Sequence, residues 1–287
     1  MTVPSLAGEI DDLWKQSQEG DVDATTVTGD QLATLDAFLA ALETGEIRAA
    51  TPDGTGNTVA KNWRVNEWVK RGILLNFSLR ETQARTYGDV AYHDVLPLRD
   101  TADLADRGTR NTPDGTTIRR GAYVGGNAIL MSPCFVNIGA YVADGTLVDS
   151  CDTIGSCAQI GANVKLGANT LIGGVLEPVE DNPVIIEDEV SLGAGCRVTS
   201  GFVVGEGSVV GENTLLTPRI PVYDLVEEEI IYGHIPPERR VFTRFVDSSL
   251  GDHALFGDAG AYKPAAVATD IEADTLDATE REERLRE

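Results

Sequence analysis

The chain has 287 residues, 42% of them hydrophobic, and a formal net charge of −23. The hydrophobic content is sufficient for a core and excludes wholesale disorder. A dispersed acidic surface repels phosphate backbones and anionic lipids, so neither nucleic acid nor a membrane is expected as a partner.

Lysine is scarce: five lysines stand beside 18 arginines and 46 acidic residues. This balance favours a halophilic protein from a salt-loaded cytoplasm, where high ionic strength screens self-repulsion; a merely acidic protein is the alternative. No signal peptide opens the chain, and no apolar run approaches the roughly 20 residues of a membrane helix. The four cysteines form no C-x-x-C pair and no histidines have ligand spacing, so no metal site is expected.

Residues 1–107 are expected to form an N-terminal helical and mixed domain. Apolar residues recur at helical spacing over 5–18, 30–43 and 64–78, and Thr28 or Asp30 is a suitable N-cap for the second helix. Residues 87–97 read as extended chain.

The centre of the chain carries a six-residue repeat. Every sixth residue from Ile118 to Ile172 is aliphatic, and after a slip of two across 173–185 the series resumes from Ile186 to Leu216. A mostly small residue precedes each aliphatic one by two positions. These features predict a mainly β fold, a left-handed parallel β-helix of hexapeptide repeats over 108–218, with a loop at 173–185. Asp152 breaks the small-residue rule, and a buried carboxylate is costly without partners.

After Leu216 the repeat decays into a C-terminal extension, 219–287. An irregular hairpin is expected over 223–232 and a strand near 241–246, followed by a charged, solvated tail over 278–287.

The repeat alone does not fix a function, because one fold hosts many activities. Three classes compete: acyltransferases, zinc carbonic anhydrase relatives and purely structural β-helices. His93, His234 and His253 all lie outside the repeats, which disfavours a three-histidine zinc site and acetyltransferases with a histidine base. A catalytic base would then be a carboxylate, and Asp149, at a predicted corner after Val148, is a candidate; a corner Asp chosen for turn geometry is the alternative.

Six segments carry a more specific pattern: 63–71 (WRVNEWVKR), 135–142 (FVNIGAYV), 145–149 (GTLVD), 154–161 (IGSCAQIG), 173–178 (GGVLEP) and 185–188 (IIED). They strongly resemble the tetrahydrodipicolinate N-succinyltransferase family, over roughly residues 62–235. The resemblance implies succinyl transfer from succinyl-CoA, a cosubstrate, to the amine of ring-opened 2-amino-6-oxopimelate in lysine and diaminopimelate synthesis. It also implies small-molecule substrates, no permanently bound cofactor, and a homotrimer with sites between subunits.

The same resemblance assigns roles to individual residues. Asp149 matches the Asp that meets the substrate amine and is the expected base, and Arg110 matches the Arg that binds the dicarboxylate. Gly174 lies in the Gly pair that lines the pantetheine channel, and Ala194 is expected to contact CoA.

Two positions depart from the family pattern. A second active-site Glu falls on Arg197, and a lysine-rich segment expected to meet the CoA phosphates falls on Thr269, Asp270 and Asp274. Arg219 and Lys263 are therefore the candidate cations for those phosphates. An acetyl-CoA-dependent N-acyltransferase acting on a related amino acid, and a non-catalytic trimeric β-helix that binds a partner, are the alternative functions.

Overall fold

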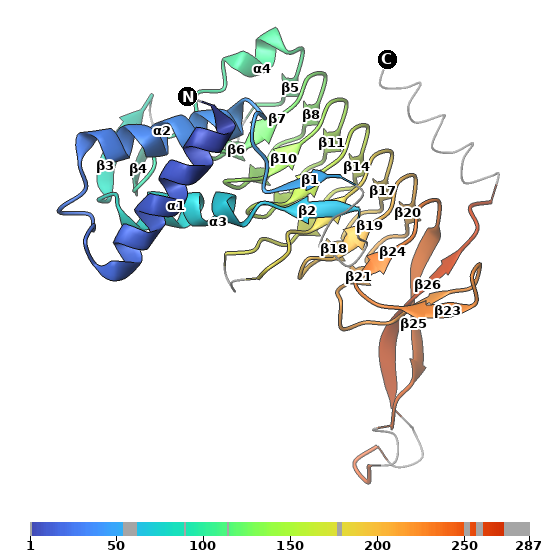
Figure 1. Cartoon of the computed structure of the whole chain (residues 1–287). Coiled ribbons are helices and arrows are strands. Elements are labelled where there is room, and N and C mark those ends of the chain that lie inside the picture. The colour runs from blue at the N-terminus through green and yellow to red at the C-terminus, as the bar shows by residue number, and fades with distance from the viewer. Residues whose placement is uncertain are drawn as a thin grey trace.

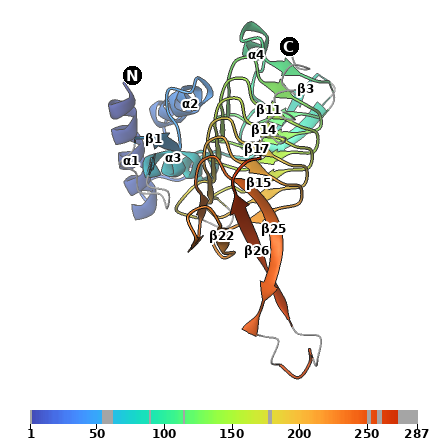
Figure 2. The same cartoon turned by 90° about the vertical axis from the view of Figure 1, so that its right-hand side faces the viewer.

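A computed structural model describes residues 2–53, 62–88, 90–113, 115–176, 180–249, 253–256 and 261–272. A helical domain lies against one side of a parallel β-helix, and a long hairpin extends from the far end of the coils (Figures 1 and 2). No helix in the described ranges has the length and apolar character needed to cross a membrane.

Three helices form the N-terminal domain: α1 (Val3–Glu19), α2 (Gly29–Glu43) and α3 (Glu67–Ser78). Of the two predicted caps for α2, Thr28 is the one used: its hydroxyl accepts the Gln31 N–H, and the Gln31 side chain accepts the Thr28 N–H. The third helix begins later than predicted, because Trp63–Val65 forms strand β2, which pairs antiparallel with β1 (Ala50–Pro52). The apolar faces of the three helices share one core with Ile138 and Cys157 of the β-helix.

A short hairpin and one helical turn connect this domain to the coils. Strands β3 (Gln83–Tyr87) and β4 (Val90–Asp94) pair antiparallel, and β4 lies within the region predicted to be extended, 87–97. Helix α4 (Asp103–Asp106) precedes the first coil strand.

Each coil contributes one two-residue strand to each of three sheets, and the coil strands pair in parallel within each sheet. The docking sheet, which faces the helical domain, contains β7 (Tyr123–Val124), β10 (Tyr141–Val142), β13 (Gln159–Ile160), β16 (Ile185–Ile186), β19 (Val203–Val204) and β24 (His234–Ile235). The third sheet contains β6 (Thr117–Ile118), β9 (Phe135–Val136), β12 (Thr153–Ile154), β15 (Leu171–Ile172), β18 (Arg197–Val198) and β21 (Leu215–Leu216). The ten-stranded sheet contains β5 (Arg110–Asn111), β8 (Ile129–Leu130), β11 (Leu147–Val148), β14 (Lys165–Leu166), β17 (Ser191–Leu192), β20 (Val209–Val210) and four C-terminal strands.

The predicted aliphatic series forms the interior of the coils. All sixteen of its members are at most 5% exposed, since each is the second residue of a coil strand and points into the prism. The predicted left-handed parallel β-helix with its helical N-terminal domain is confirmed.

The slip in the repeat is an insertion between β15 and β16 that contacts the helical domain. Val175 packs into the helical core, and Lys70 Nζ of α3 donates to the carbonyl of Glu180 at 2.9 Å. Pro178, which the sequence places in this loop, lies outside the described residues.

The helical domain is also held to the docking sheet by polar and aromatic contacts. Arg48 places its guanidinium 3.7 Å from the ring centroid of Tyr141 and donates from Nε to Gln159 Oε1 at 3.0 Å. Trp63 Nε1 donates to Glu187 Oε1 at 2.8 Å. These contacts cover the docking sheet and leave the ten-stranded sheet accessible on its outer face.

The C-terminal strands lengthen that accessible sheet. Strands β22 (Val222–Asp224) and β23 (Glu229–Ile231) form the predicted hairpin, and β25 (Arg240–Asp247) contains the predicted strand. The β25 strand pairs parallel with β20 and antiparallel with β26 (Tyr262–Thr269). The expected charged tail, 278–287, lies outside the described residues.

Candidate active site

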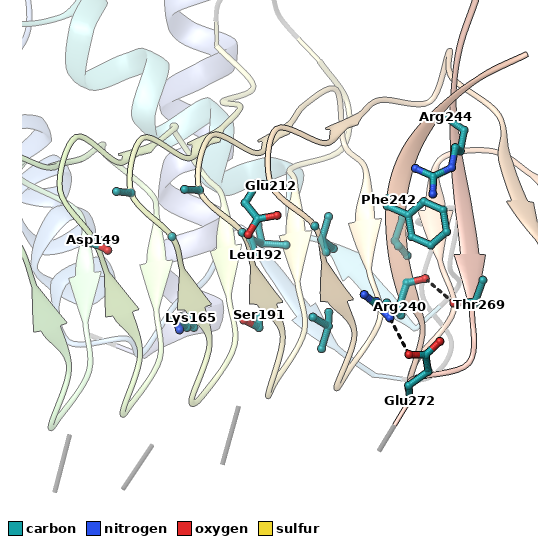
Figure 3. A pocket seen from close by; sticks show the side chains of 18 of the residues that line it. Asp149, Lys165, Ser191, Leu192, Glu212, Arg240, Phe242, Arg244, Thr269 and Glu272 are labelled. Atoms are coloured by element: carbon teal, nitrogen blue, oxygen red, sulfur yellow. Dashed lines mark hydrogen bonds and ion pairs between the residues drawn. The ribbon is translucent and has the colours of Figure 1, made fainter. Parts of the chain in front are cut away.

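A groove of about 1040 Å³ runs along the ten-stranded sheet from Asp149 to the β25–β26 hairpin (Figure 3). Lys165 and Ser191 lie between these ends, and Arg240, Phe242 and Arg244 lie at the hairpin end. The five strands from β11 to β25 are four spacings apart, about 19 Å. The groove therefore suits an elongated ligand rather than a compact one.

The floor of the groove is a ladder of coil corners. Asp149, Gly167, Gly193 and Gly211 each follow an aliphatic residue, and these aliphatic residues are paired in register from coil to coil. A Cβ at Gly167 would lie 2.7 Å from the Ala194 backbone nitrogen, so coil stacking itself demands glycine there. The result is a row of small residues along which only Asp149 presents a carboxylate at this corner position.

Asp149 is half-buried and held by its neighbours on the same corner. Its Oδ1 accepts the Ser150 N–H at 2.7 Å, and its own N–H donates to Asp152 Oδ2 at 2.7 Å. Its carboxylate faces the groove together with Ala194, which is exposed there. Two of the predicted site residues, Asp149 and Ala194, thus share one surface.

Arg110 lies on the same sheet but does not line the groove. It is exposed on β5, which is two strands from β11, or about 10 Å, and its Nη2 lies 4.0 Å from Met131 Sδ. A ligand that reaches from Asp149 towards the first coil would meet this guanidinium.

Gly174 lies in a second cavity, of about 520 Å³, at another corner of the coils. Phe77, Arg119 and Ser156 share this cavity, and a Cβ at Gly174 would lie 2.5 Å from Ser156 Oγ. Arg197, at the position of the expected second carboxylate, is exposed on the third sheet. Within one chain neither Gly174 nor Arg197 lines the groove that contains Asp149.

The cations at the far end of the groove differ from those predicted. Arg219 follows the last coil and Lys263 lies on β26, and neither lines the groove. Arg240 and Arg244 do: Arg240 Nη1 lies 3.3 Å from Glu272 Oε2, and the Arg244 guanidinium carbon lies 4.1 Å from the Phe242 ring centroid. Sequence reasoning missed them: the strand was predicted near 241–246, whereas β25 starts at Arg240, and alternation along it places residues 240, 242 and 244 on one face.

The buried cysteines are unsuited to act as nucleophiles. Burial raises the pKa of Cys157 to about 12 and that of Cys196 to about 11, so both thiols stay protonated near neutral pH. Among the described residues, no group of three or more His, Cys, Asp or Glu side chains is arranged to hold a metal ion.

Family models match one segment of the helical domain and one segment of the coils. Residues 5–79 match a family model described as tetrahydrodipicolinate N-succinyltransferase N-terminal, and residues 183–218 match one described as hexapeptide repeat of succinyl-transferase. The 2,3,4,5-tetrahydropyridine-2,6-dicarboxylate N-succinyltransferase of Dechloromonas aromatica is 35% identical over 289 positions, covering all of both chains. The chain belongs to the tetrahydropyridine-dicarboxylate N-succinyltransferase family.

Two further members of this family show the same full-length similarity. The Methylobacterium sp. (strain 4-46) protein is 36% identical over all of both chains, and that of Caulobacter vibrioides is 36% identical over 98% of this chain and 99% of its own. The family similarity therefore includes the helical domain as well as the coils and the C-terminal extension, the two parts that line the groove.

Proposed function

We propose that this chain transfers a succinyl group from succinyl-CoA to the amine of ring-opened tetrahydrodipicolinate, 2-amino-6-oxopimelate, in lysine and diaminopimelate biosynthesis. The observation that carries the proposal is the groove itself. A carboxylate at Asp149 stands at one end, a floor of small corner residues follows, and Arg240 and Arg244 stand at the other end. An elongated thioester with an anionic terminus matches this order of groups.

The reaction needs one base and one positioned electrophile. The amine nitrogen attacks the thioester carbonyl carbon, a C–N bond forms, and collapse of the tetrahedral adduct breaks the C–S bond. Asp149 takes the proton that the amine loses, and the protonated carboxyl then returns it to the departing CoA thiolate, which leaves as the thiol. Direct transfer to the amine requires no cysteine nucleophile, and the buried thiols of Cys157 and Cys196 stay protonated near neutral pH.

The two ends of the substrates meet separate cations in this proposal. Arg110 binds a carboxylate of the acceptor from the first-coil side of Asp149, where a planar guanidinium forms paired hydrogen bonds. Arg240 and Arg244 take the CoA phosphates at the hairpin end, in place of Arg219 and Lys263. Ala194 leaves space beside the corner ladder for the pantetheine arm.

The separation of Gly174 from Asp149 within one chain supports assembly as a homotrimer. Gly174, in the second cavity, lies away from the Asp149 groove. Packing one coil corner against another subunit would allow Gly174 of one chain to complete the pantetheine channel beside Asp149 of its neighbour. We propose that the active sites lie at these subunit boundaries.

The acidic composition suggests where the enzyme works. A net charge of −23 is best tolerated when salt screens like charges, so we propose a halophilic enzyme of the cytoplasm. Activity and folding should both be measured across a range of KCl concentrations.

The deciding experiment is loss of the thioester absorbance with 2-aminopimelate as a stable acceptor in molar KCl. Succinyl-CoA and acetyl-CoA are compared side by side. Turnover with succinyl-CoA supports the proposal, whereas a preference for acetyl-CoA reassigns the donor. Absence of turnover with either donor, in a folded protein, would exclude this acyl transfer.

A further inference from the structure

Asp152 occupies an interior column of the third sheet in which hydroxyl and thiol side chains otherwise predominate. The column lies two residues before each buried aliphatic residue and comprises Thr116, Cys134, Asp152, Thr170, Cys196 and Thr214. Thr170 and Thr214 each donate a hydroxyl hydrogen bond to the carbonyl three residues earlier, at Gly167 and Gly211. In those two coils the column residue therefore donates a hydrogen bond to the backbone of its own corner.

The side chain of Asp152 instead accepts hydrogen bonds from the backbone at the corresponding corner. Its Oδ2 accepts the N–H of Asp149, three residues earlier, and its Oδ1 accepts the N–H of Thr170 on the next coil, both at 2.7 Å. Its own N–H donates to the Asp149 carbonyl at 3.2 Å. Asp152 is 2% exposed, and it grips the backbone of Asp149 from both main chain and side chain.

The Asp149 side chain is restrained by a hydrogen bond of its own. The Ser150 N–H that follows it donates to Asp149 Oδ1, so the carboxylate and its backbone are anchored within one turn. Both oxygens of Asp152 retain lone pairs for these N–H groups whether or not the carboxyl carries a proton. The arrangement thus restrains the corner in either charge state.

Coil stacking does not require an acid at this position. Burial raises the pKa of Asp152 to about 8, and the charge of Asp149 adds to this rise, whereas the N–H groups of Thr170 and Asp149 oppose it. The site therefore disfavours the charged form of Asp152. A threonine, as at position 170, would fill the same interior position without the free-energy cost of burying an ionisable group. Three residues before each column member lies the equivalent corner position, and in the described coils Asp149 is the only acid there.

We propose that Asp152 is a positioning residue that holds Asp149 in its orientation for proton transfer. It acts through the Asp149 backbone and touches neither substrate. The inference rests on the proposed role of Asp149 as the base.

The test compares Asp152→Thr with a matched control, Thr146→Val. Thr146 is fully buried in the same coil, and its hydroxyl donates to the Gly161 carbonyl and accepts the Val164 N–H of the next coil. Thr146→Val therefore also removes a buried side-chain contact between coils, but one away from Asp149. For Asp152→Thr we expect kcat for succinyl-CoA and 2-aminopimelate to fall about tenfold, KM for succinyl-CoA to stay within about twofold, and thermal stability to hold or rise. Thr146→Val should keep kcat within about twofold.

Two outcomes would overturn the inference. One is unchanged kcat in Asp152→Thr; the other is a fall in kcat that merely follows loss of folded protein. Amide hydrogen exchange of the peptide containing Asp149 provides a readout independent of activity, with faster exchange expected in Asp152→Thr and unchanged exchange contradicting the grip. If the unmodified protein lacks turnover, the proposed function fails, and the exchange result alone decides whether Asp152 restrains this corner.

Discussion

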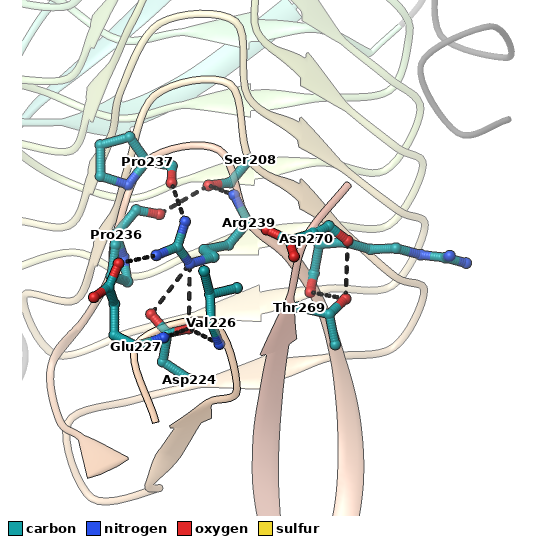
Figure 4. A network of polar contacts seen from close by, with 10 residues as sticks. Ser208, Asp224, Val226, Glu227, Pro236, Pro237, Arg239, Thr269 and Asp270 are labelled. Atoms are coloured by element: carbon teal, nitrogen blue, oxygen red, sulfur yellow. Dashed lines mark hydrogen bonds and ion pairs between the residues drawn. The ribbon is translucent and has the colours of Figure 1, made fainter. Parts of the chain in front are cut away.

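Arg239 Nε lies 3.1 Å from Oδ2 and 3.2 Å from Oδ1 of Asp224, whose side chain is fully buried (Figure 4). The same guanidinium reaches the Pro237 carbonyl, and the Arg239 N–H donates to Ser208 Oγ. This pair ties the β22–β23 hairpin to the last coil beside β25. Arg239 directly precedes Arg240, which lines the groove.

Arg239→Met should therefore be strongly destabilising. Removing the cation leaves the Asp224 carboxylate buried without its ionic partner, which typically costs about 3–5 kcal/mol. Denaturant unfolding measures the loss. Lys15→Met is the control, because Lys15 and Asp12 are 69% and 71% exposed and such pairs contribute about 0–1 kcal/mol. Equal effects in the two variants would contradict a special role for the buried pair.

Asp149→Asn should abolish most turnover while the protein stays folded. Asparagine keeps the shape and can still accept the Ser150 N–H, but it cannot take a proton, so kcat should fall by about 10²–10⁴. Asp144→Asn is the matched control: Asp144 is a corner residue of the same coil whose Oδ1 accepts the Gly126 N–H at 2.8 Å. Near-normal turnover in Asp149→Asn would remove Asp149 from the role of base.

Arg244→Ala should raise KM for succinyl-CoA at least several-fold and leave kcat at saturation nearly unchanged. The reason is that Arg244 lies at the hairpin end of the groove, far from the reacting carbon. Steady-state kinetics at fixed KCl measures the effect. Arg219→Ala and Lys263→Ala test the cations suggested by sequence alone; a larger KM rise in either than in Arg244→Ala would move the phosphate site.

The stability of Asp152→Thr relative to the unmodified protein should grow with pH. The folded pKa of Asp152 is raised to about 8 from an ordinary 3.8, so between these values the unfolded chain releases a proton that the folded chain retains. Rising pH therefore destabilises the unmodified protein in this window, and the threonine variant lacks this loss. Thermal unfolding of both proteins from pH 5 to pH 8 at constant salt provides the comparison. A stability difference between the two proteins that does not change with pH would show that Asp152 keeps an ordinary pKa. The titratable groups that interact with Asp152 are the Asp149 carboxylate and the Cys134 thiol.

Periodicity predicted much of the fold. Each of the sixteen residues in the six-residue series from Ile118 to Leu216 is buried in the coil interior, because a stacked coil repeats one local environment. The series also predicted that Asp149 lies at a corner, because Asp149 directly follows Val148. The start of α3 was predicted too early, since Trp63–Val65 is drawn into a strand by pairing with Ala50–Pro52, a contact that helical spacing does not contain.

Other features required contacts between distant residues. The partners of Asp152 could not be predicted, because Thr170 reaches it only after a complete coil has returned. Arg240 and Arg244 were likewise missed as groove residues, since their place follows from pairing of β25 with β20 after the intervening C-terminal hairpin.

The sequence by itself determined the coil, its buried series, its family and the corner that carries Asp149, because all of these are local or periodic properties. Tertiary structure decided which surfaces share a groove: it joined Asp149 with Ala194, Arg240 and Arg244, and it separated Gly174 and Arg197 from them. The physical reason is that outward-facing side chains of a coil are assigned to one of three faces by the coil geometry. What covers each face is set by long-range packing of the helical domain and the C-terminal hairpin.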